Sequence, residues 1–252
     1  MEALLIDLNG VLYVDDALIP GAVEAIETVR AKGIPCRFTT NSTTRSLESL
    51  HQNLIKLGLP IEREEILSPS YAAVLYLRSL GNPACHLIVA EDTKKDFAEF
   101  AESFTRPDVI VIGDIGERWN YPIMNKAFEM VMYGAKIVAL HKGKYWQVGN
   151  DLKLDIGAFI SGLEYATGRE ALVIGKPSRS FFEMALTDLK VAPDRVIMIG
   201  DDIDSDVGGA QQAGMRGVLV KTGKYRPELV ARSGIDPDGV LDSIADIETL
   251  FR

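Results

Sequence analysis

Four short polar segments contain the residue types that could do chemistry, and each follows an apolar run. They are Asp7–Gly10, Thr40–Thr43, Gly175–Ser178 and Asp201–Asp206. Clustered carboxylates suit an octahedral Mg²⁺ that keeps several waters. Hydroxyls and backbone N–H groups at a helix N-terminus suit phosphate oxygens, and a lysine supplies a point charge for the same oxygens. If these segments meet, they would form a site for a phosphoryl group and a divalent metal ion.

Each segment also has an ordinary structural interpretation when it is taken alone. Asn9-Gly10 is a strong signal for a tight turn, and Thr40–Thr43 could be a helix N-cap cluster. Gly175–Ser178 places a proline at the start of a helix. Asp201–Asp206 could be a solvated acidic loop or a calcium loop, although it lacks the glycine and the distal glutamate of an EF-hand. All four segments in this order, each after a strand-like run, favour the site.

Asp7 is the candidate nucleophile of such a site. It ends an apolar run, and α/β enzymes bind their ligands beyond the carboxyl ends of buried strands. Carboxylates packed this densely would repel a phosphate unless a metal ion lay beside them. One of the carboxylates must therefore do something other than bind phosphate. An aspartate that forms an aspartyl-phosphate is a known solution.

Apolar strand-like runs alternate with amphipathic helical patterns along the chain. Strands are predicted at Ala3–Asp7, Pro35–Thr39, His86–Ala90, Val109–Gly113, Ile137–His141, Ala171–Gly175, Val196–Gly200 and Gly217–Val220. Helices are predicted at Gly21–Lys32, Thr44–Leu57, Tyr121–Tyr133, Ile156–Ala166 and Ser180–Leu189. This alternation predicts an α/β fold with a parallel sheet. If the strands before the four polar segments are neighbours, the segments converge on one crevice.

The distribution of the polar loops predicts two domains. The loops lie in Asp7–Asn41 and again in Lys176–Asp206, and the block between them has strands and helices of its own. We therefore expect a core formed by residues 1–71 and 173–252 and an inserted domain at 72–172. The stretch Lys142–Asn150, KGKYWQVGN, is predicted to form a hairpin in the insert.

The composition of the chain limits the binding partners and the cellular compartment that we expect. The 252-residue chain carries a net charge of −9, which argues against nucleic-acid binding. Its two cysteines, Cys36 and Cys85, are expected to be buried thiols in a reducing cytoplasm. We expect no signal peptide, because the N-terminus starts directly on a strand pattern. We also expect no membrane contact, because no apolar run approaches the ~18 residues of a bilayer-spanning helix.

The four segments together resemble the motifs of the haloacid dehalogenase-like (HAD) phosphatase superfamily. The matching stretches are IDLNGVLY with Asp7, FTTN with Thr40, GKP with Lys176, and GDDIDSD with Asp201 and Asp206. The resemblance extends over the whole chain and implies a Rossmann-like core. The inserted block resembles the C2-type cap of the NagD-like subgroup. Further stretches with this resemblance are GKYWQ, LDIGAFISGLEYATG and GKPSRSFFEMAL.

The resemblance assigns a role to each matching residue. Asp7 would be the nucleophile, and Mg²⁺ would be held by Asp7, the main-chain carbonyl of Asn9, and Asp201. Phosphoryl oxygens would be bound by Thr40, Asn41 and Lys176. Asp206, with the adjacent Asp202, would support the metal ligands from behind. The substrate would be a small phosphorylated compound or pyrophosphate, and the cap would form a homodimer.

Asn9 departs from the superfamily pattern, which most often has a second aspartate at this position to protonate the leaving oxygen. The NagD-like subgroup also lacks this aspartate and typically has serine. An amide cannot exchange a proton near neutral pH, and general acid–base help contributes about 10²–10⁴ in rate. We therefore expect hydrolysis of good leaving groups, such as aryl and acyl phosphates, phosphoramidates and metal-bound pyrophosphate. A substitute acid, Asp202, Asp16 or Asp155, is the alternative explanation.

Two other functions compete with this prediction. Asn9 is the one feature that favours a phosphate- or metabolite-binding sensor without turnover, whereas the retention of Asp7, Lys176 and Asp201 counts against it. A haloalkanoate dehalogenase would use the same nucleophile. The metal site and the phosphate loop disfavour that reading.

Overall fold

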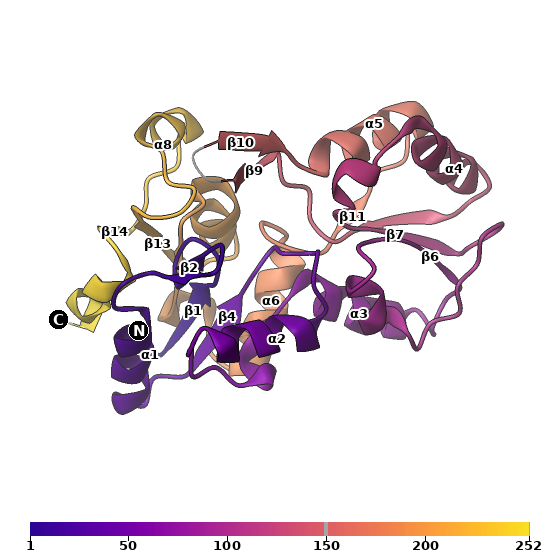
Figure 1. Cartoon of the computed structure of the whole chain (residues 1–252). Helices are drawn as coiled ribbons and strands as arrows, with labels where there is room; N and C mark the ends of the chain where they lie inside the picture. Colours follow the sequence, from indigo (N-terminus) through magenta and orange to yellow (C-terminus); the bar gives the residue numbers. More distant parts are fainter. Residues whose placement is uncertain (149–150, 252) are drawn as a thin grey trace. The chain divides into compact units, whose positions relative to one another are not determined.

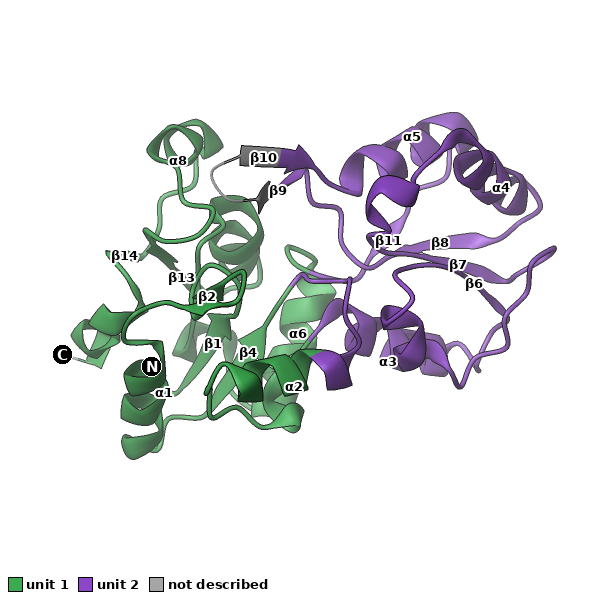
Figure 2. Ribbon diagram, in the orientation of Figure 1, with its two compact units in different colours: residues 1–40, 50–67, 176–252 green, residues 41–49, 68–175 purple. Residues whose placement is uncertain are grey.

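The computed structural model describes residues 1–148 and 151–251 and divides into two compact units (Figure 2). Unit 1 comprises Met1–Thr40, Leu50–Leu67 and Lys176–Arg252. Unit 2 comprises Asn41–Ser49 and Ser68–Gly175. The sequence placed residues 41–49, 68–71 and 173–175 in the core, whereas their contacts assign them to unit 2. That unit 1 is a catalytic core and unit 2 a cap stays a prediction.

A six-stranded parallel sheet is the centre of unit 1 (Figure 1). Its strand order is β14-β13-β12-β1-β4-β5. The bounds are β1 Ala3–Asp7, β4 Cys36–Thr39, β5 Ile66–Leu67, β12 Val196–Gly200, β13 Arg216–Val220 and β14 Gly239–Leu241. Every residue of β1 and β12 is buried, as expected for strands covered on both faces. The carboxyl ends of β12, β1 and β4 therefore lie next to one another at one edge of the sheet.

Helices connect the strands of unit 1. They are α1 Ala22–Ala31, α2 Leu47–Lys56, α6 Arg179–Leu189, α7 Gly209–Gln212 and α8 Pro227–Ser233. The boundary between the two units falls inside α2. The α1 helix packs beside the C-terminal turn Ile244–Phe251, where Lys32 lies over the Phe251 ring. The two ends of the chain thus meet on the same side of unit 1 (Figure 1).

Unit 2 has its own parallel sheet, with the strand order β11-β8-β7-β6. Its strands are β6 Cys85–Ile88, β7 Val109–Ile112, β8 Lys136–Ala139 and β11 Leu172–Val173, and its helices are α3 Pro69–Ser79, α4 Tyr121–Met132 and α5 Gly157–Thr167. An apolar core that includes Ile110, Ile112, Met130 and Ile160 fills the space between the sheet and α4 and α5. Unit 2 therefore has a hydrophobic core of its own.

Two antiparallel hairpins accompany the parallel sheets. In unit 1, β2 Tyr13–Val14 pairs with β3 Ala17–Leu18, directly after the Asn9-Gly10 turn. In unit 2, β9 Tyr145–Val148 pairs with β10 Asp151–Leu154. This pair contains the hairpin predicted from the KGKYWQVGN stretch, of which Gly149 and Asn150 lie outside the described residues.

The α/β fold with parallel sheets is confirmed, and one placement is wrong. The predicted strand Ala171–Gly175 shortens to β11, which pairs with β8 in the sheet of unit 2. Lys176 therefore does not extend from a strand of the same sheet as Asp7. A short apolar run specifies a buried strand, but it carries no information about which of two sheets will bury it.

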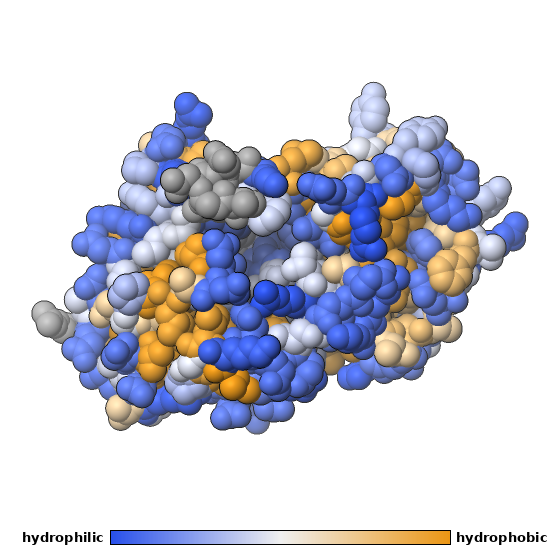
Figure 3. Space-filling view, in the orientation of Figure 1, coloured by the Kyte–Doolittle hydropathy of each residue, from blue (hydrophilic) through white to orange (hydrophobic). Residues whose placement is uncertain are grey.

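The face of the protein shown in Figure 3 is largely hydrophilic, with hydrophobic patches between the hydrophilic residues. Among the described residues, no helix combines the length and the apolarity needed to cross a bilayer.

Candidate active site

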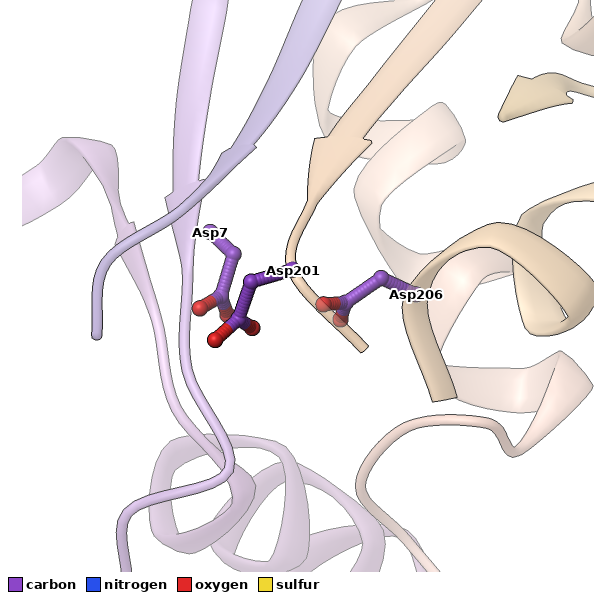
Figure 4. A group of neighbouring side chains, drawn as sticks. All are labelled: Asp7, Asp201 and Asp206. Atoms are coloured by element: carbon purple, nitrogen blue, oxygen red, sulfur yellow. The ribbon is translucent and has the colours of Figure 1, made fainter. Parts of the chain in front are cut away.

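The site lies at the carboxyl edge of the unit 1 sheet, where two neighbouring strands each deliver an aspartate (Figure 4). Asp7 is the last residue of β1, and Asp201 directly follows β12. The two strands pair in parallel with Ile6 opposite Ile199, so Asp7 comes level with Gly200 and Asp201 follows one residue further along. Their carboxyl groups lie side by side in Figure 4.

Asp206 completes a cluster of three carboxylates. It lies on the helical turn Ile203–Gly208, and its carboxyl group faces those of Asp7 and Asp201 (Figure 4). One oxygen from each of the three groups lies within 4.8 Å of the other two, and all three residues are buried. Three acids at this distance in a buried position require positive charge nearby.

Lys176 supplies part of that charge. Its ammonium group, 2% exposed, donates hydrogen bonds to Asp7 Oδ1 and to Asp206 Oδ1, the latter at 2.6 Å. It also lies 3.3 Å from Thr39 Oγ1. Burial alone would lower the pKa of Lys176, but the carboxylates of Asp206 and Asp7 raise it above its ordinary value. The lysine is therefore charged at neutral pH and is fixed between two aspartates.

Asp206 holds both this lysine and the turn that follows β12. Its Oδ2 accepts a hydrogen bond of 3.1 Å from the Asp202 N–H. A Cβ at Gly200 would overlap the Asp206 side chain, so the strand end has room only for glycine. Asp206 thus orients Lys176 and the backbone of Asp202. The predicted support of a metal ion by Asp206 stays a prediction.

Asp202 is directed into a different set of contacts. Its Oδ1 accepts hydrogen bonds from the N–H groups of Asp204 and Ser205, at 3.1 and 3.0 Å. Its Oδ2 pairs with the Lys224 ammonium at 3.2 Å. Burial would raise the pKa of Asp202, but Lys224 and the N–H of Ser205 lower it overall. Asp202 is thus an ionised N-cap that contacts a lysine.

The loop Thr222–Lys224 closes the site from the side of β13. The Lys224 N–H donates to Asp201 Oδ2 at 2.7 Å, and the Thr222 hydroxyl donates to the carbonyl of Gly10. Gly10 and Gly223 both have positive φ, and a Cβ at either position would overlap the Asp201 carboxylate. These two glycines therefore allow the loops after β1 and β13 to approach Asp201, which lies in the loop after β12.

The ionisation of the cluster favours the binding of a cation. Burial raises the pKa of Asp7 to about 7, even though Lys176 lowers it. Burial, together with repulsion from Asp7 and Asp206, raises the pKa of Asp201 well above its ordinary value. Carboxylates in such a position bind either protons or a metal ion. The all-oxygen donor set fits a hard divalent cation such as Mg²⁺.

The remaining predicted residues follow the carboxyl ends of β1 and β4. Asn9 is exposed and belongs to the turn in which the Gly10 N–H donates to the Tyr13 carbonyl at 2.7 Å. Thr40 is buried at the end of β4, and its N–H donates to the Leu67 carbonyl. Asn41 follows Thr40 directly and is grouped with unit 2. Their predicted roles toward phosphate and metal stay predictions.

Sequence reasoning missed Thr39, Thr222 and Lys224. Thr39 was assigned to the interior of a strand, although its hydroxyl is within reach of Lys176. The stretch KTGKY carries a turn glycine directly after a buried strand, and this is the same signal that identified the other loops. Applied to β13, that signal would have found the Thr222–Lys224 loop.

Comparisons with known proteins define the class. A family model described as haloacid dehalogenase-like hydrolase matches residues 4–102, and a second, described as HAD-hydrolase-like, matches residues 173–247. Haloacid dehalogenase-like hydrolase domain-containing protein 2 of Bos taurus is 42% identical over 226 residues, which cover 90% of this chain and 86% of that protein. The chain therefore belongs to the haloacid dehalogenase-like hydrolase family.

Particular relatives narrow the comparison. Phospholysine phosphohistidine inorganic pyrophosphate phosphatase of Bos taurus is 38% identical over 257 residues, covering 100% of this chain and 94% of that protein. Among solved structures, 4-nitrophenylphosphatase of Thermotoga maritima matches with a TM-score of 0.91 at 25% identity, covering 99% of this chain and 97% of that one. NagD of E. coli shares the fold, with a TM-score of 0.85 at 22% identity, covering 98% of each chain. The predicted resemblance to NagD-like members of the family is confirmed.

Proposed function

We propose that this chain is a Mg²⁺-dependent phosphatase that transfers a phosphoryl group to Asp7 and then to water. The observation that carries the proposal is the buried arrangement of Asp7 and Asp201 at adjacent strand ends, with Lys176 bonded to Asp7. The 4-nitrophenylphosphatase and pyrophosphate phosphatase names of similar proteins support the same class of reaction.

The metal ion would be held by Asp7, Asp201 and the main-chain carbonyl of Asn9. The raised pKa values of the two aspartates support a bound cation at this position. When bound, Mg²⁺ would neutralise charge on the phosphoryl oxygens and on the nucleophile. Asp206 would act through Lys176 and the Asp202 backbone.

The chain's own residues would carry the two steps. A carboxylate oxygen of Asp7 attacks phosphorus, and the bond from phosphorus to the leaving oxygen or nitrogen breaks with its electron pair on the leaving group. Water then attacks the aspartyl-phosphate, which restores the Asp7 carboxylate and releases inorganic phosphate. Lys176 would supply positive charge to the phosphoryl oxygens, and Thr40 and Asn41 would donate hydrogen bonds to them.

The position of Asn9 limits which groups can leave. Asp202, one predicted substitute acid, is held ionised by Lys224 and is therefore a poor proton donor at neutral pH. Asp16 is exposed in the turn between β2 and β3, and Asp155 lies in unit 2, where its carboxylate accepts from the Ile156 N–H. We therefore infer a preference for leaving groups that need no proton from the enzyme. Aryl phosphates and metal-bound pyrophosphate release a stabilised anion, and a phosphoramidate that already carries a proton on its nitrogen releases a neutral amine.

A direct assay tests the proposal. The native chain should release phosphate from p-nitrophenyl phosphate in the presence of Mg²⁺ and lose this activity in excess chelator. Asp7→Asn should reduce the rate by at least about 10³, because the amide is no nucleophile. An unchanged rate in Asp7→Asn would disprove the assignment of the nucleophile.

The same assay distinguishes the phosphatase from the alternative of a phosphate-binding sensor. A binding protein without turnover would bind phosphate and Mg²⁺ but release no product from any phosphorylated compound. The ion pair between Lys176 and the candidate nucleophile favours the enzyme, because a sensor has no need of a buried carboxylate that faces the anion.

The predicted cellular setting is part of the proposal. Both cysteines are buried and free, as expected for thiols in a reducing cytoplasm. A homodimer formed through unit 2 is also proposed.

A further inference from the structure

Lys224 contacts the carboxylate cluster through its backbone and through its side chain. Its N–H donates to Asp201 Oδ2 at 2.7 Å, and its ammonium donates to Asp202 Oδ2 at 3.2 Å. Its side chain is 30% exposed, compared with 2% for Lys176. The Lys224 ammonium, like that of an ordinary lysine, is charged at neutral pH, and here it forms an ion pair with a carboxylate.

The charges of the site balance in a particular way. The clustered carboxylates of Asp7, Asp201 and Asp206 and the adjacent one of Asp202 carry four negative charges. The Lys176 ammonium pairs with Asp7 and Asp206, and the Lys224 ammonium pairs with Asp202. Fully ionised, the six groups leave two negative charges, which one divalent cation cancels. Without Lys224 three negative charges would remain, and the metal-loaded site would repel a phosphate.

Lys224 also determines where Asp202 points. The three carboxylates that approach one another as potential metal ligands are those of Asp7, Asp201 and Asp206. Asp202 directs one oxygen to the N–H groups of Asp204 and Ser205 and the other to Lys224. Both of its oxygens are therefore occupied away from the cluster.

We propose that Lys224 is a positioning residue that holds Asp202 aside and limits the charge of the site to that matched by one divalent ion. The inference rests on the proposed Mg²⁺ site, but it does not depend on turnover. It makes Lys224 responsible for the balance between binding the metal ion and binding the phosphoryl anion.

Binding measurements on the full chain test this role. Mg²⁺ and inorganic phosphate would be titrated calorimetrically, phosphate at saturating Mg²⁺. Lys224→Met should raise the affinity for Mg²⁺ about three- to tenfold and lower that for phosphate by a similar factor, because a unit charge is removed close to both. Lys224→Arg keeps the charge and should bind both ions within about twofold of the native chain.

The opposite change at Asp202 gives an independent test. Asp202→Asn keeps the Oδ1 acceptor of the N-cap and removes one negative charge. It should lower the affinity for Mg²⁺ about three- to tenfold. The double variant Lys224→Met with Asp202→Asn restores the charge balance, so its Mg²⁺ affinity should return to within about twofold of the native value.

Lys221→Met is the matched control. Lys221 lies in the same segment after β13 but pairs with the exposed Asp242 at 2.8 Å. Its replacement should change neither affinity. A native chain that binds no Mg²⁺, or a Lys224→Met chain that binds Mg²⁺ as weakly as or more weakly than the native chain, would overturn the inference.

The outcomes for turnover and for charge balance are distinct. If the predicted affinity shifts occur in a chain that hydrolyses nothing, the phosphatase proposal fails and the role of Lys224 stands. If the chain is an active phosphatase whose Lys224 and Asp202 variants bind Mg²⁺ like the native chain, the role of Lys224 fails. Should Lys224→Met not fold, the Asp202→Asn result decides.

Discussion

Asn9 is exposed at the turn after β1, whereas the carboxylates of Asp7, Asp201 and Asp206 are buried beside it. The side chain at position 9 is therefore the one that can differ without disturbing the cluster. An aspartate here would add a proton donor and leave the main-chain carbonyl unchanged.

Asn9→Asp should therefore change substrate preference. We expect kcat/KM for alkyl phosphates to rise about 10²-fold, since general acid help is worth about 10²–10⁴. The rate with p-nitrophenyl phosphate should change less than about threefold. The measurement is kcat/KM across a series of leaving-group pKa values, with Asn9→Ser as the control that adds no carboxyl group. Equal rates for Asn9→Asp and the native chain on alkyl esters would contradict this account.

The raised pKa of Asp7 makes the stability of the metal-free protein depend on pH. The folded chain keeps a proton on Asp7 up to about pH 7, whereas the unfolded chain releases it near pH 4. Stability without metal should therefore fall as the pH rises from about 4 to about 7. Melting temperatures in chelator across this range would show the decline.

Mg²⁺ should counter that decline, because it binds the ionised carboxylates that the proton otherwise occupies. Its addition should raise the melting temperature more at pH 8 than at pH 5. At a Mg²⁺ concentration of 100 times Kd, binding should raise the free energy of unfolding by about 2.7 kcal/mol. Asp7→Asn removes one of the two carboxyl groups with a raised pKa, the other being Asp201, and should therefore weaken the pH dependence of the Mg²⁺ effect. A Mg²⁺ effect equal at the two pH values would count against the metal site.

At the scale of elements, the loops after β1, β12 and β13 depend on close backbone packing around Asp201. Gly223 has φ of +59°, and a Cβ there would overlap both the Asp201 carboxylate and the Gly10 backbone. Gly58, with φ of +83°, has open space around the same position. Replacing each glycine with alanine therefore distinguishes the cost of backbone strain, present at both positions, from the cost of crowding, present only at Gly223.

Gly223→Ala should destabilise the protein by about 2–4 kcal/mol, from left-handed strain and overpacking together. Gly58→Ala should cost about 1–2 kcal/mol from strain alone. Denaturant unfolding measures both, and Mg²⁺ titration should show weaker binding for Gly223→Ala only. If both variants lose the same stability and bind Mg²⁺ normally, the crowding at Asp201 is not important.

The sequence predicted elements best where burial was complete. The bounds of β1 and β12 match their predictions because each is a short buried run that follows a charged residue and is apolar apart from the terminal Asp7 of β1. The two-residue β5 and the half-exposed β14 were missed, since neither has enough alternating or apolar residues to stand out. The α3 helix was also missed, although Ser68 and Pro69 form a recognisable helix start.

The candidate site was predictable to the extent that its residues follow strands. Asp7 and Asp201 meet because their strands are neighbours; the alternating pattern predicts a parallel sheet, whereas this strand order comes from the structure. Lys176 reaches Asp7 from a segment that follows a strand of a different sheet, so only tertiary structure shows that ion pair. Lys224 contacts Asp201 through a backbone N–H, and no residue type signals such a contact.

At the scale of the whole molecule, the predicted homodimer can be tested on unit 2. Tyr121, Met132 and Tyr133 on or beside α4, and Tyr165 on α5, are exposed by 79%, 60%, 72% and 94%. If this surface forms the dimer, light scattering should give twice the chain mass of 27.6 kDa. Met132→Lys with Tyr165→Lys should then give monomers, whereas Tyr71→Lys, on α3, should not. A native chain of monomer mass would disprove the dimer.

The most direct test of the whole account is whether Asp7 becomes phosphorylated during turnover. The chain would be mixed with p-nitrophenyl phosphate and Mg²⁺, quenched in acid within the first turnovers, and analysed by peptide mass spectrometry. A phosphoryl group on Asp7, absent without Mg²⁺ and absent in Asp7→Asn, is the predicted result. Steady release of phosphate with Asp7 unmodified, and with Asp7→Asn as active as the native chain, would contradict it.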